Sequence, residues 1–174
     1  MDSVKKCIAE IASNFTANRM LRDYEVRFYN RLAARKRELS ENDFAVAREL
    51  VAWKHKVLAA CPAVKFVGVQ RARVGDKPIF IGRSYHFELT LDLAGLAPED
   101  VGAELVVARP VEPDRVVEVI RTVPLSQVQV SGSQVTFALD YVPEQAGMFD
   151  MALRIFPQNP MLPHRMDFAL VKWA

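Results

Sequence analysis

The hydrophobic positions change their period once along the chain, from a helical repeat to a strand repeat. Residues 16–39 contain no Gly or Pro, and large apolar side chains recur there at spacings of three and four. These side chains are Leu21, Tyr24, Phe28 and Leu32. That spacing puts them on one face of a long amphipathic helix and predicts that this face is buried against a partner. The sequence must either supply that partner or leave it outside the chain.

Two further helices are predicted around the long one. Residues 4–12 carry apolar side chains at the helical period and predict a short helix, and Thr16 is a suitable N-cap for the long helix. Ser40 and Asp43 resemble a capping box that opens a third helix over residues 41–60, with Pro62 beyond its end. Because the link between the second and third helices is short, we expect the third helix to be an antiparallel or sharply angled neighbour of the second, with an αα-hairpin over residues 16–61 as the preferred interpretation.

From Val64 onwards apolar and polar residues alternate, as in strands with one buried face. The predicted strands number about seven. They are 64–72, 85–93, 103–109, 116–123, 134–141, 149–155 and 166–173. Turn signals lie between them, including Gly75-Asp76, Pro110 with Pro113, and Ser131-Gly132 as a hairpin tip. Residues 97–100 predict one helical turn.

This order of elements predicts an α+β fold with two parts. Residues 1–61 form the helical segment, with its αα-hairpin, and residues 62–174 form an antiparallel β-sandwich of immunoglobulin-like type. The formal charge divides at the same place. Residues 1–61 hold 12 basic and 8 acidic side chains, whereas residues 62–174 hold 11 and 13.

Composition excludes several classes of protein. The 174 residues are 51% hydrophobic and 25% charged, which is typical of globular domains. A net charge of +2 is too small to indicate a nucleic-acid partner, and no apolar run approaches the ~20 residues that span a bilayer. Cys7 and Cys61 are the two cysteines, so we expect reduced thiols and a cytoplasmic location.

The sequence contains no recognised catalytic or metal-binding motif. His55, His86 and His164 are far apart, and none belongs to a recognised metal-binding pattern with a Cys, Asp or Glu three or four residues away. There is no Gly-rich phosphate loop and no Gly-x-Ser-x-Gly motif. His86 is predicted to make a cross-strand hydrogen bond, and the adjacent pair Glu99 and Asp100 to cap a turn. No catalytic, cofactor-binding or metal-binding residue is assigned.

Two groups of residues have both a structural and a functional interpretation. The basic cluster Arg31, Arg35, Lys36 and Arg37 could bind phosphate, but the charges also suit the C-terminal end of a helix. The aromatic residues Trp53, Tyr85, Tyr141 and Trp173 could stack on sugar rings. Since both tyrosines lie on the apolar side of their strands, only Trp53 and Trp173 remain candidates for glucan stacking.

The N-terminal segment VKKCIAEIASNFTANRMLRDYEVRFYN resembles the C-terminal helices of bacterial α-glucan phosphorylases, which act on glycogen or maltodextrin. The matching positions are Lys5, Ile8, Ile11, Phe15, Thr16, Arg19, Met20, Leu21, Asp23, Tyr24, Phe28 and Tyr29. The closing phrase RIFPQNPMLPHRMDFALVKWA looks like the end of the β-rich domain that follows these helices in the short-form branch. The resemblance is strong over residues 4–60 and 153–174 and looser between them.

The resemblance implies a C-terminal region without the catalytic domains. Family members carry two Rossmann-like domains and a lysine-bound pyridoxal phosphate, and the motifs for both are absent here. The chain by itself is therefore expected to be no enzyme and to bind no cofactor. Its expected partners are the catalytic domains of the parent phosphorylase, with α-glucan or a second copy of the chain as further candidates.

Two hypotheses follow from the sequence. In the first, the chain is a non-catalytic accessory region of an α-glucan phosphorylase, with structural, assembly or glucan-contact roles. In the second, it is an autonomous β-sandwich module that binds carbohydrate or protein. Glucan-affinity electrophoresis of variants at Trp53 and Trp173 would separate the two.

Overall fold

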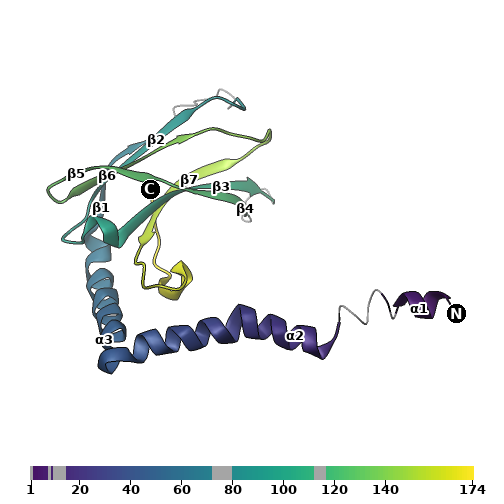
Figure 1. Ribbon diagram of the computed structural model, residues 1–174. Coiled ribbons are helices and arrows are strands. Elements are labelled where there is room, and N and C mark those ends of the chain that lie inside the picture. Colours follow the sequence, from purple (N-terminus) through teal and green to yellow (C-terminus); the bar gives the residue numbers. More distant parts are fainter. Residues whose placement is uncertain (1, 8, 10–14, 72–79, 112–116) are drawn as a thin grey trace. The chain divides into compact units, whose positions relative to one another are not determined.

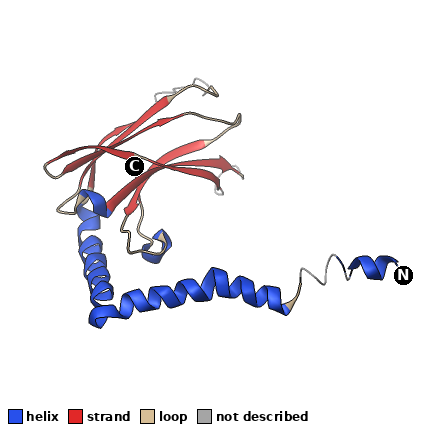
Figure 2. Ribbon diagram, viewed as in Figure 1, coloured by secondary structure: helices blue, strands red, loops and turns tan. Residues whose placement is uncertain are grey.

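The computed structural model describes residues 2–7, 9, 15–71, 80–111 and 117–174. The chain divides into two compact units, Met1–Ala52 and Trp53–Ala174. The first unit is helical, and the second contains two antiparallel sheets of four strands each (Figures 1 and 2). The predicted α+β class is therefore confirmed. None of the helices within the described ranges is long and apolar enough to cross a membrane.

The long helix of the first unit starts where its cap predicts. The helical part of the chain consists of α1 Asp2–Cys7, α2 Ala17–Tyr24, the π-helix η2 Glu25–Tyr29 and α3 Asn30–Ala60, whose last turns belong to the second unit. The Thr16 hydroxyl accepts a hydrogen bond from the backbone N–H of Arg19 at 3.2 Å, which satisfies one of the free amides at the helix start. Helical structure then continues through α2 and η2 into α3 without a loop.

The predicted αα-hairpin is not what the structure contains. Two helical segments are joined directly at Glu41–Phe44, where Asn42, Asp43 and Phe44 have φ values of 49°, 55° and 60°. The capping box does not form, because the Ser40 hydroxyl donates to the carbonyl of Arg37 and the Asp43 carboxylate pairs with Arg48. No described side chain between residues 15 and 52 is buried, so the tight packing of a helical hairpin is absent from this unit.

Within its described residues the second unit contains eight strands, where about seven were predicted. They are β1 Lys65–Gln70, β2 Tyr85–Asp92, β3 Val101–Pro110, β4 Val117–Pro124, β5 Ser126–Ser131, β6 Gln134–Tyr141, β7 Asp150–Pro157 and β8 Lys172–Trp173. One sheet has the order β1-β2-β6-β5, and the other has the order β4-β3-β7-β8. Short 3-10 helices lie at η3 Cys61–Ala63, η4 Pro98–Asp100 and η5 Arg165–Phe168.

The alternating residues of the central strands form the core between the sheets. β2 and β6 pair in register, with Phe87 opposite Leu139 and Leu91 opposite Val135, while β3 and β7 pair with Leu105 opposite Leu153. Leu91, Leu105 and Val135 are fully buried. The alternation in the sequence therefore predicted the buried faces of β2, β6 and β7 correctly, whereas β3 does not alternate and is buried on both faces over residues 101–108.

Two strands differ from the prediction, and the seven-strand immunoglobulin-like arrangement is not confirmed. β5 was not predicted, and the predicted strand over residues 166–173 is instead η5 followed by the two-residue β8. The predicted turn over residues 97–100 and the hairpin tip at Ser131-Gly132 are present. The predictions for Ile8, residues 10–12, Ala72, Gly75-Asp76, Pro113 and Val116 lie outside the described residues.

Three of the four sheet edges carry a β-bulge. The pairing register shifts at Val67 in β1, at Ile120 in β4 and at Val128 in β5, and each of these residues is the extra one in its strand. The fourth edge is the short β8. Bulges and short strands interrupt the row of free N–H and C=O groups that would otherwise pair with another sheet. The sandwich is therefore protected against edge-to-edge extension.

Candidate interaction site

The apolar face of the long helix is exposed along its whole length. The residues predicted to be buried have exposed fractions of 57% (Leu21), 43% (Tyr24), 52% (Phe28) and 64% (Leu32). Met20 and Tyr29 are exposed as well. We call Met20, Leu21, Tyr24, Phe28, Tyr29 and Leu32 the aromatic face. Folded proteins seldom leave so many contiguous large apolar side chains in water, so this face marks an interaction site.

The π-helix in the middle of this helix brings three aromatic rings together. The backbone N–H of Asn30 bonds to the carbonyl of Glu25, five residues earlier, instead of to the carbonyl four residues earlier. The Tyr24 ring centroid lies 6.1 Å from that of Phe28 and 6.3 Å from that of Tyr29. These distances suit tilted aromatic packing. Tyr24 is thus the centre of the aromatic face.

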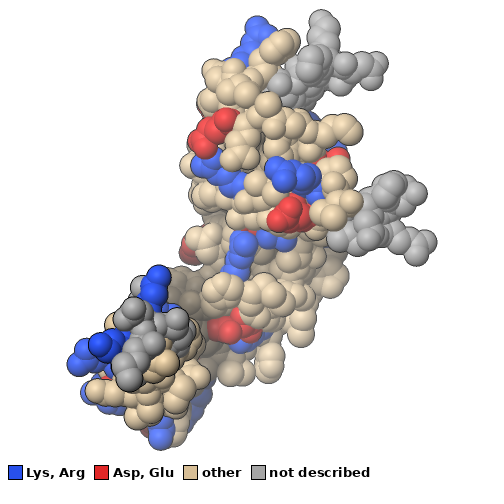
Figure 3. All heavy atoms as spheres, turned by 90° about the vertical axis from the view of Figure 1, so that its right-hand side faces the viewer, with Lys and Arg blue, Asp and Glu red and all other residues tan. Residues whose placement is uncertain are grey.

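The aromatic face is surrounded mainly by positive charge. Residues 15–40 contain seven Lys and Arg side chains and three Asp and Glu side chains. Arg19 pairs with Asp23, and Arg35 pairs with Glu38, both at 2.8 Å. Lys and Arg side chains gather around the helical unit in the space-filling view (Figure 3). The predicted basic cluster at Arg31, Arg35, Lys36 and Arg37 is part of this surrounding charge.

Asp100 joins the last turns of α3 to the sandwich within the second unit. Its carboxylate accepts hydrogen bonds from the indole N–H of Trp53 at 2.7 Å, from Lys56 Nζ at 2.9 Å and from the backbone N–H of Ala97 at 3.1 Å. Burial alone would raise the pKa of Asp100, but these hydrogen bonds to the ionised form lower the pKa below its usual value. Asp100 is thus a cap, as predicted, and also a link between elements far apart in sequence.

Glu104 makes a second buried charge cluster on the β4-β3-β7-β8 sheet. Its side chain is 4% exposed, and its two oxygens are paired with Arg154 at 2.5 Å and with Arg165 at 2.6 Å. The Arg165 guanidinium also lies 5.4 Å from the Phe156 ring centroid, which is a cation–π distance. Since Arg165 belongs to η5, this cluster fixes the closing segment of the chain against the sheet.

The two tryptophans predicted for glucan stacking have different environments. Trp53 is 9% exposed, and its ring packs edge-on against Phe168 at 5.5 Å, so it offers no free face. Trp173 is 52% exposed in β8, with the Arg154 guanidinium 5.2 Å from its ring centroid. The structure does not bring the two indoles into one site. Trp173 alone keeps a surface on which a sugar could stack.

His86 lies between two carboxylates on the outer surface of the other sheet. Its Nδ1 is 2.8 Å from the Asp140 carboxylate, and its Nε2 is 3.8 Å from that of Glu88. The hydrogen bond with Asp140 is the main reason that the pKa of His86 is raised above 6.5. This is the predicted cross-strand interaction.

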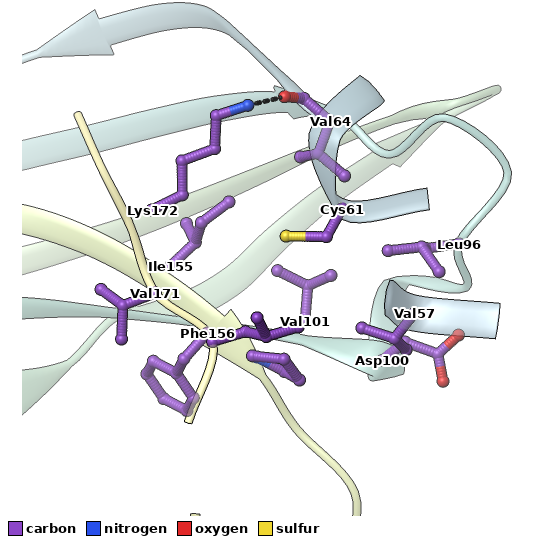
Figure 4. A pocket seen from close by; sticks show the side chains of 12 residues that line it. Val57, Cys61, Val64, Leu96, Asp100, Val101, Ile155, Phe156, Val171 and Lys172 are labelled. Carbon is purple, nitrogen blue, oxygen red and sulfur yellow. Dashed lines mark hydrogen bonds between the residues drawn. The ribbon is translucent and has the colours of Figure 1, made fainter. Parts of the chain in front are cut away.

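A small apolar hollow lies at the junction of α3 and the sandwich (Figure 4). Its volume is about 20 Å³, and Val57, Cys61, Leu96, Val101 and Ile155 contribute to its lining. Lys172 also lines it, with its Nζ bonded to the Val64 carbonyl. That volume holds about one water molecule, so the hollow does not fit pyridoxal phosphate. Within the described residues, no group of three or more His, Cys, Asp and Glu could hold a metal ion.

Comparison with known proteins decides the family. Residues 62–174 match the family described as the glycogen phosphorylase C-terminal domain. The chain belongs to this family. It is 26% identical to the glycogen phosphorylases of Mycobacterium bovis and Mycobacterium tuberculosis strain H37Rv over 100% of its length. It is also 26% identical to the maltodextrin phosphorylase of Thermococcus litoralis over 98% of its length.

The glycogen phosphorylase C-terminal domain is one part of a longer protein in these relatives. The chain spans about a fifth of the length of the curated relatives that it matches, since the alignments cover 20% of each. The match therefore assigns this chain to the C-terminal region of such phosphorylases. The resemblance found in the sequence is confirmed in its family and in its position.

Sequence reasoning missed parts of the candidate site for identifiable reasons. Tyr29 is five residues from Tyr24, and a helical period of 3.6 places it on a different face. Three aromatic residues within residues 24–29 were the available signal. Glu104 was missed because its partners, Arg154 and Arg165, are far away in sequence.

Proposed function

We propose that the chain is a non-catalytic accessory region of an α-glucan phosphorylase, docked through its aromatic face onto the part of the enzyme that precedes it. The exposed aromatic face carries this proposal. The curated relatives are about five times as long as this chain. A surface in the rest of such a protein would cover the apolar helix face that is exposed here.

The catalytic domains are the partner we propose for this face, and the sandwich stabilises the docked segment. Asp100 and Glu104 support this role, because Asp100 ties the last turns of α3 to the sandwich and Glu104 ties the closing segment to its sheet. Catalysis and pyridoxal phosphate are assigned to the catalytic domains, since the motifs that the family uses for both are absent from this sequence. The free thiol of Cys61 supports a cytoplasmic location.

A copurification experiment tests the proposal. The tagged 174-residue chain is coexpressed with the portion of the Thermococcus litoralis maltodextrin phosphorylase that precedes its matching region. We expect the two to copurify, and Tyr24→Ser to weaken the association at least about tenfold, as truncation of a central aromatic anchor does. Val130→Ser, which changes an exposed apolar residue of β5, is the control and should have no effect. If the wild-type chain does not copurify, the docking proposal is wrong.

A second candidate function is contact with α-glucan, favoured by the half-exposed indole of Trp173. The Arg154 guanidinium, fixed by Glu104, covers part of this indole and restricts its movement. The apolar C–H face of a glucose unit could pack on the remaining ring surface, while nearby polar groups bond its hydroxyls. The same site would serve an autonomous carbohydrate-binding module, the alternative to an accessory region.

Affinity electrophoresis in gels that contain glycogen or amylose tests glucan contact. We expect the wild-type chain to be retarded, Trp173→Ala to migrate as in a glucan-free gel, and Phe80→Ala, at another exposed aromatic residue, to behave as wild type. Equal migration of wild type and Trp173→Ala would exclude a role for Trp173. Size-exclusion chromatography with light scattering separates docking to a different protein from association of two copies.

A further inference from the structure

The π-helix η2 sets the alignment of the aromatic face. In a regular α-helix, residues five apart are separated by about 140° around the axis, so Tyr29 would point away from Tyr24. A π turn contains about one residue more than an α-helical turn, so it removes most of the angular separation between Tyr24 and Tyr29. The two rings accordingly lie on the same face, with their centroids 6.3 Å apart.

We propose that η2 is an alignment device, which keeps the side chains before and after it on one docking face. Met20 and Leu21 lie before η2, Tyr29 is its last residue and Leu32 follows it, and all four are exposed. Val26 lies within η2, on the side of the helix opposite to Tyr24, and it is also exposed. The inference rests on the proposed docking of this face to the preceding part of a phosphorylase.

The charges on the helix indicate what kind of surface covers this face. Seven basic and three acidic side chains within residues 15–40 give the segment a net charge of +4. Two copies brought together along this face would place like charges around a shared apolar centre, which is unfavourable. The partner surface that fits is apolar in the middle and acidic at its rim, and it lies in the preceding part of the phosphorylase.

Single-residue deletions test the alignment directly. Deletion of Val26 should convert the π turn into an α-helical turn, in which Tyr29 becomes the fourth residue after Tyr24 and stays on its face. Deletion of Arg22, from the regular helix α2, should rotate Met20 and Leu21 by about 100° relative to Tyr24, so that Met20 takes the place of Leu21 and Leu21 leaves the face. The two deletions remove one exposed residue each and differ in their effect on the alignment.

The measurement is the apparent affinity of the tagged 174-residue chain for the preceding portion of the Thermococcus litoralis maltodextrin phosphorylase. We expect deletion of Val26 to leave the affinity within about threefold of wild type and deletion of Arg22 to reduce it at least about tenfold, a loss of about 1.4 kcal/mol. Far-ultraviolet circular dichroism of each variant should show that helix content is retained.

The possible outcomes separate this inference from the docking proposal. If Tyr24→Ser and both deletions weaken binding, the docking stands and the alignment role of η2 is wrong. If deletion of Arg22 leaves binding intact, the alignment of the face has no importance and the inference is wrong. If wild type does not bind, or binds as well after Tyr24→Ser, the docking proposal falls and the inference falls with it.

Discussion

The indole N–H of Trp53 donates to the carboxylate of Asp100 at 2.7 Å, across 47 positions of sequence. Both groups are buried, and Lys56 supplies the opposite charge at 2.9 Å. This bond anchors the last turns of α3 to the sandwich within one compact unit. It also shows why Trp53 is a structural residue in this unit, since its polar atom and its ring are both occupied.

Replacement of Asp100 should lower the free energy of unfolding. Asp100→Ala leaves the Trp53 indole N–H and the Ala97 amide without their acceptor, and we expect a loss of about 2–4 kcal/mol in the free energy of unfolding. Urea denaturation followed by circular dichroism measures it. Glu99→Ala changes the exposed neighbour in the same turn and should stay within about 0.5 kcal/mol of wild type. A loss of similar size in both variants would contradict the role given to Asp100.

The lowered pKa of Asp100 predicts a loss of stability in acid. Because the folded state holds its proton less tightly than the unfolded state, this contribution is present above the unfolded pKa of 3.8 and is lost as pH falls through the lower folded value. Unfolding free energies of wild type and Asp100→Asn should therefore converge as pH falls below about 4. A constant difference between the two across this range would show that ionisation of Asp100 does not contribute.

His86 should titrate above its ordinary pKa, and the stability linkage has the opposite sign. Its contribution is present below the unfolded pKa of 6.5 and is lost as pH rises through the raised folded value. Nuclear magnetic resonance titration of the imidazole should show Asp140→Asn lowering the pKa of His86 more than Glu88→Gln does, because Asp140 makes the shorter contact. Equal effects of both variants would contradict this assignment.

The buried Glu104 should be essential to the attachment of the closing segment. Glu104→Ala leaves the guanidinium of Arg154 without its partner in a largely buried site, and we expect a loss of about 3–5 kcal/mol in the free energy of unfolding. Arg165→Ala removes a partner whose side chain is 40% exposed, and should cost less. Chemical denaturation ranks the two variants, and the reverse order would be inconsistent with this cluster.

Gly102 should tolerate no larger side chain. A Cβ at this position would lie 2.7 Å from the Phe156 ring and 2.6 Å from the Gln158 side-chain oxygen, so Gly102→Ala should destabilise the sandwich by about 1–3 kcal/mol. Phe156→Leu in the same chain should recover part of the loss if the ring is the obstacle. The absence of any recovery in the thermal midpoint of the double variant would point to Gln158 instead.

The sequence predicted what local periodicity determines and missed what depends on distant contacts. The Thr16 cap and the buried faces of β2, β6 and β7 follow from short-range patterns. β5 was not predicted, although valine and glutamine alternate along it, and all its residues are exposed. The helical hairpin failed because the left-handed backbone of Asn42–Phe44 joins two helical segments where a capping box was expected.

Only part of the candidate site could be predicted from the sequence, for the same reason. A period of 3.6 identified Leu21, Tyr24, Phe28 and Leu32 and the need for a partner, but it assumed a uniform helix. The π turn changes which residues share a face, and no local rule marks where such a turn occurs. The family resemblance supplied what periodicity could not, because it indicates a larger phosphorylase in which we propose that the partner of this face lies.

The bulges in β1, β4 and β5 have a consequence for how this protein behaves when it is made without its partner. An apolar helix face tends to make a protein cluster at high concentration, and open sheet edges would turn such clusters into growing fibrils. The like charges around the aromatic face oppose such clusters, and the interrupted edges offer no continuous strand on which fibrils could grow. We therefore expect the chain to resist fibril formation when it is made alone.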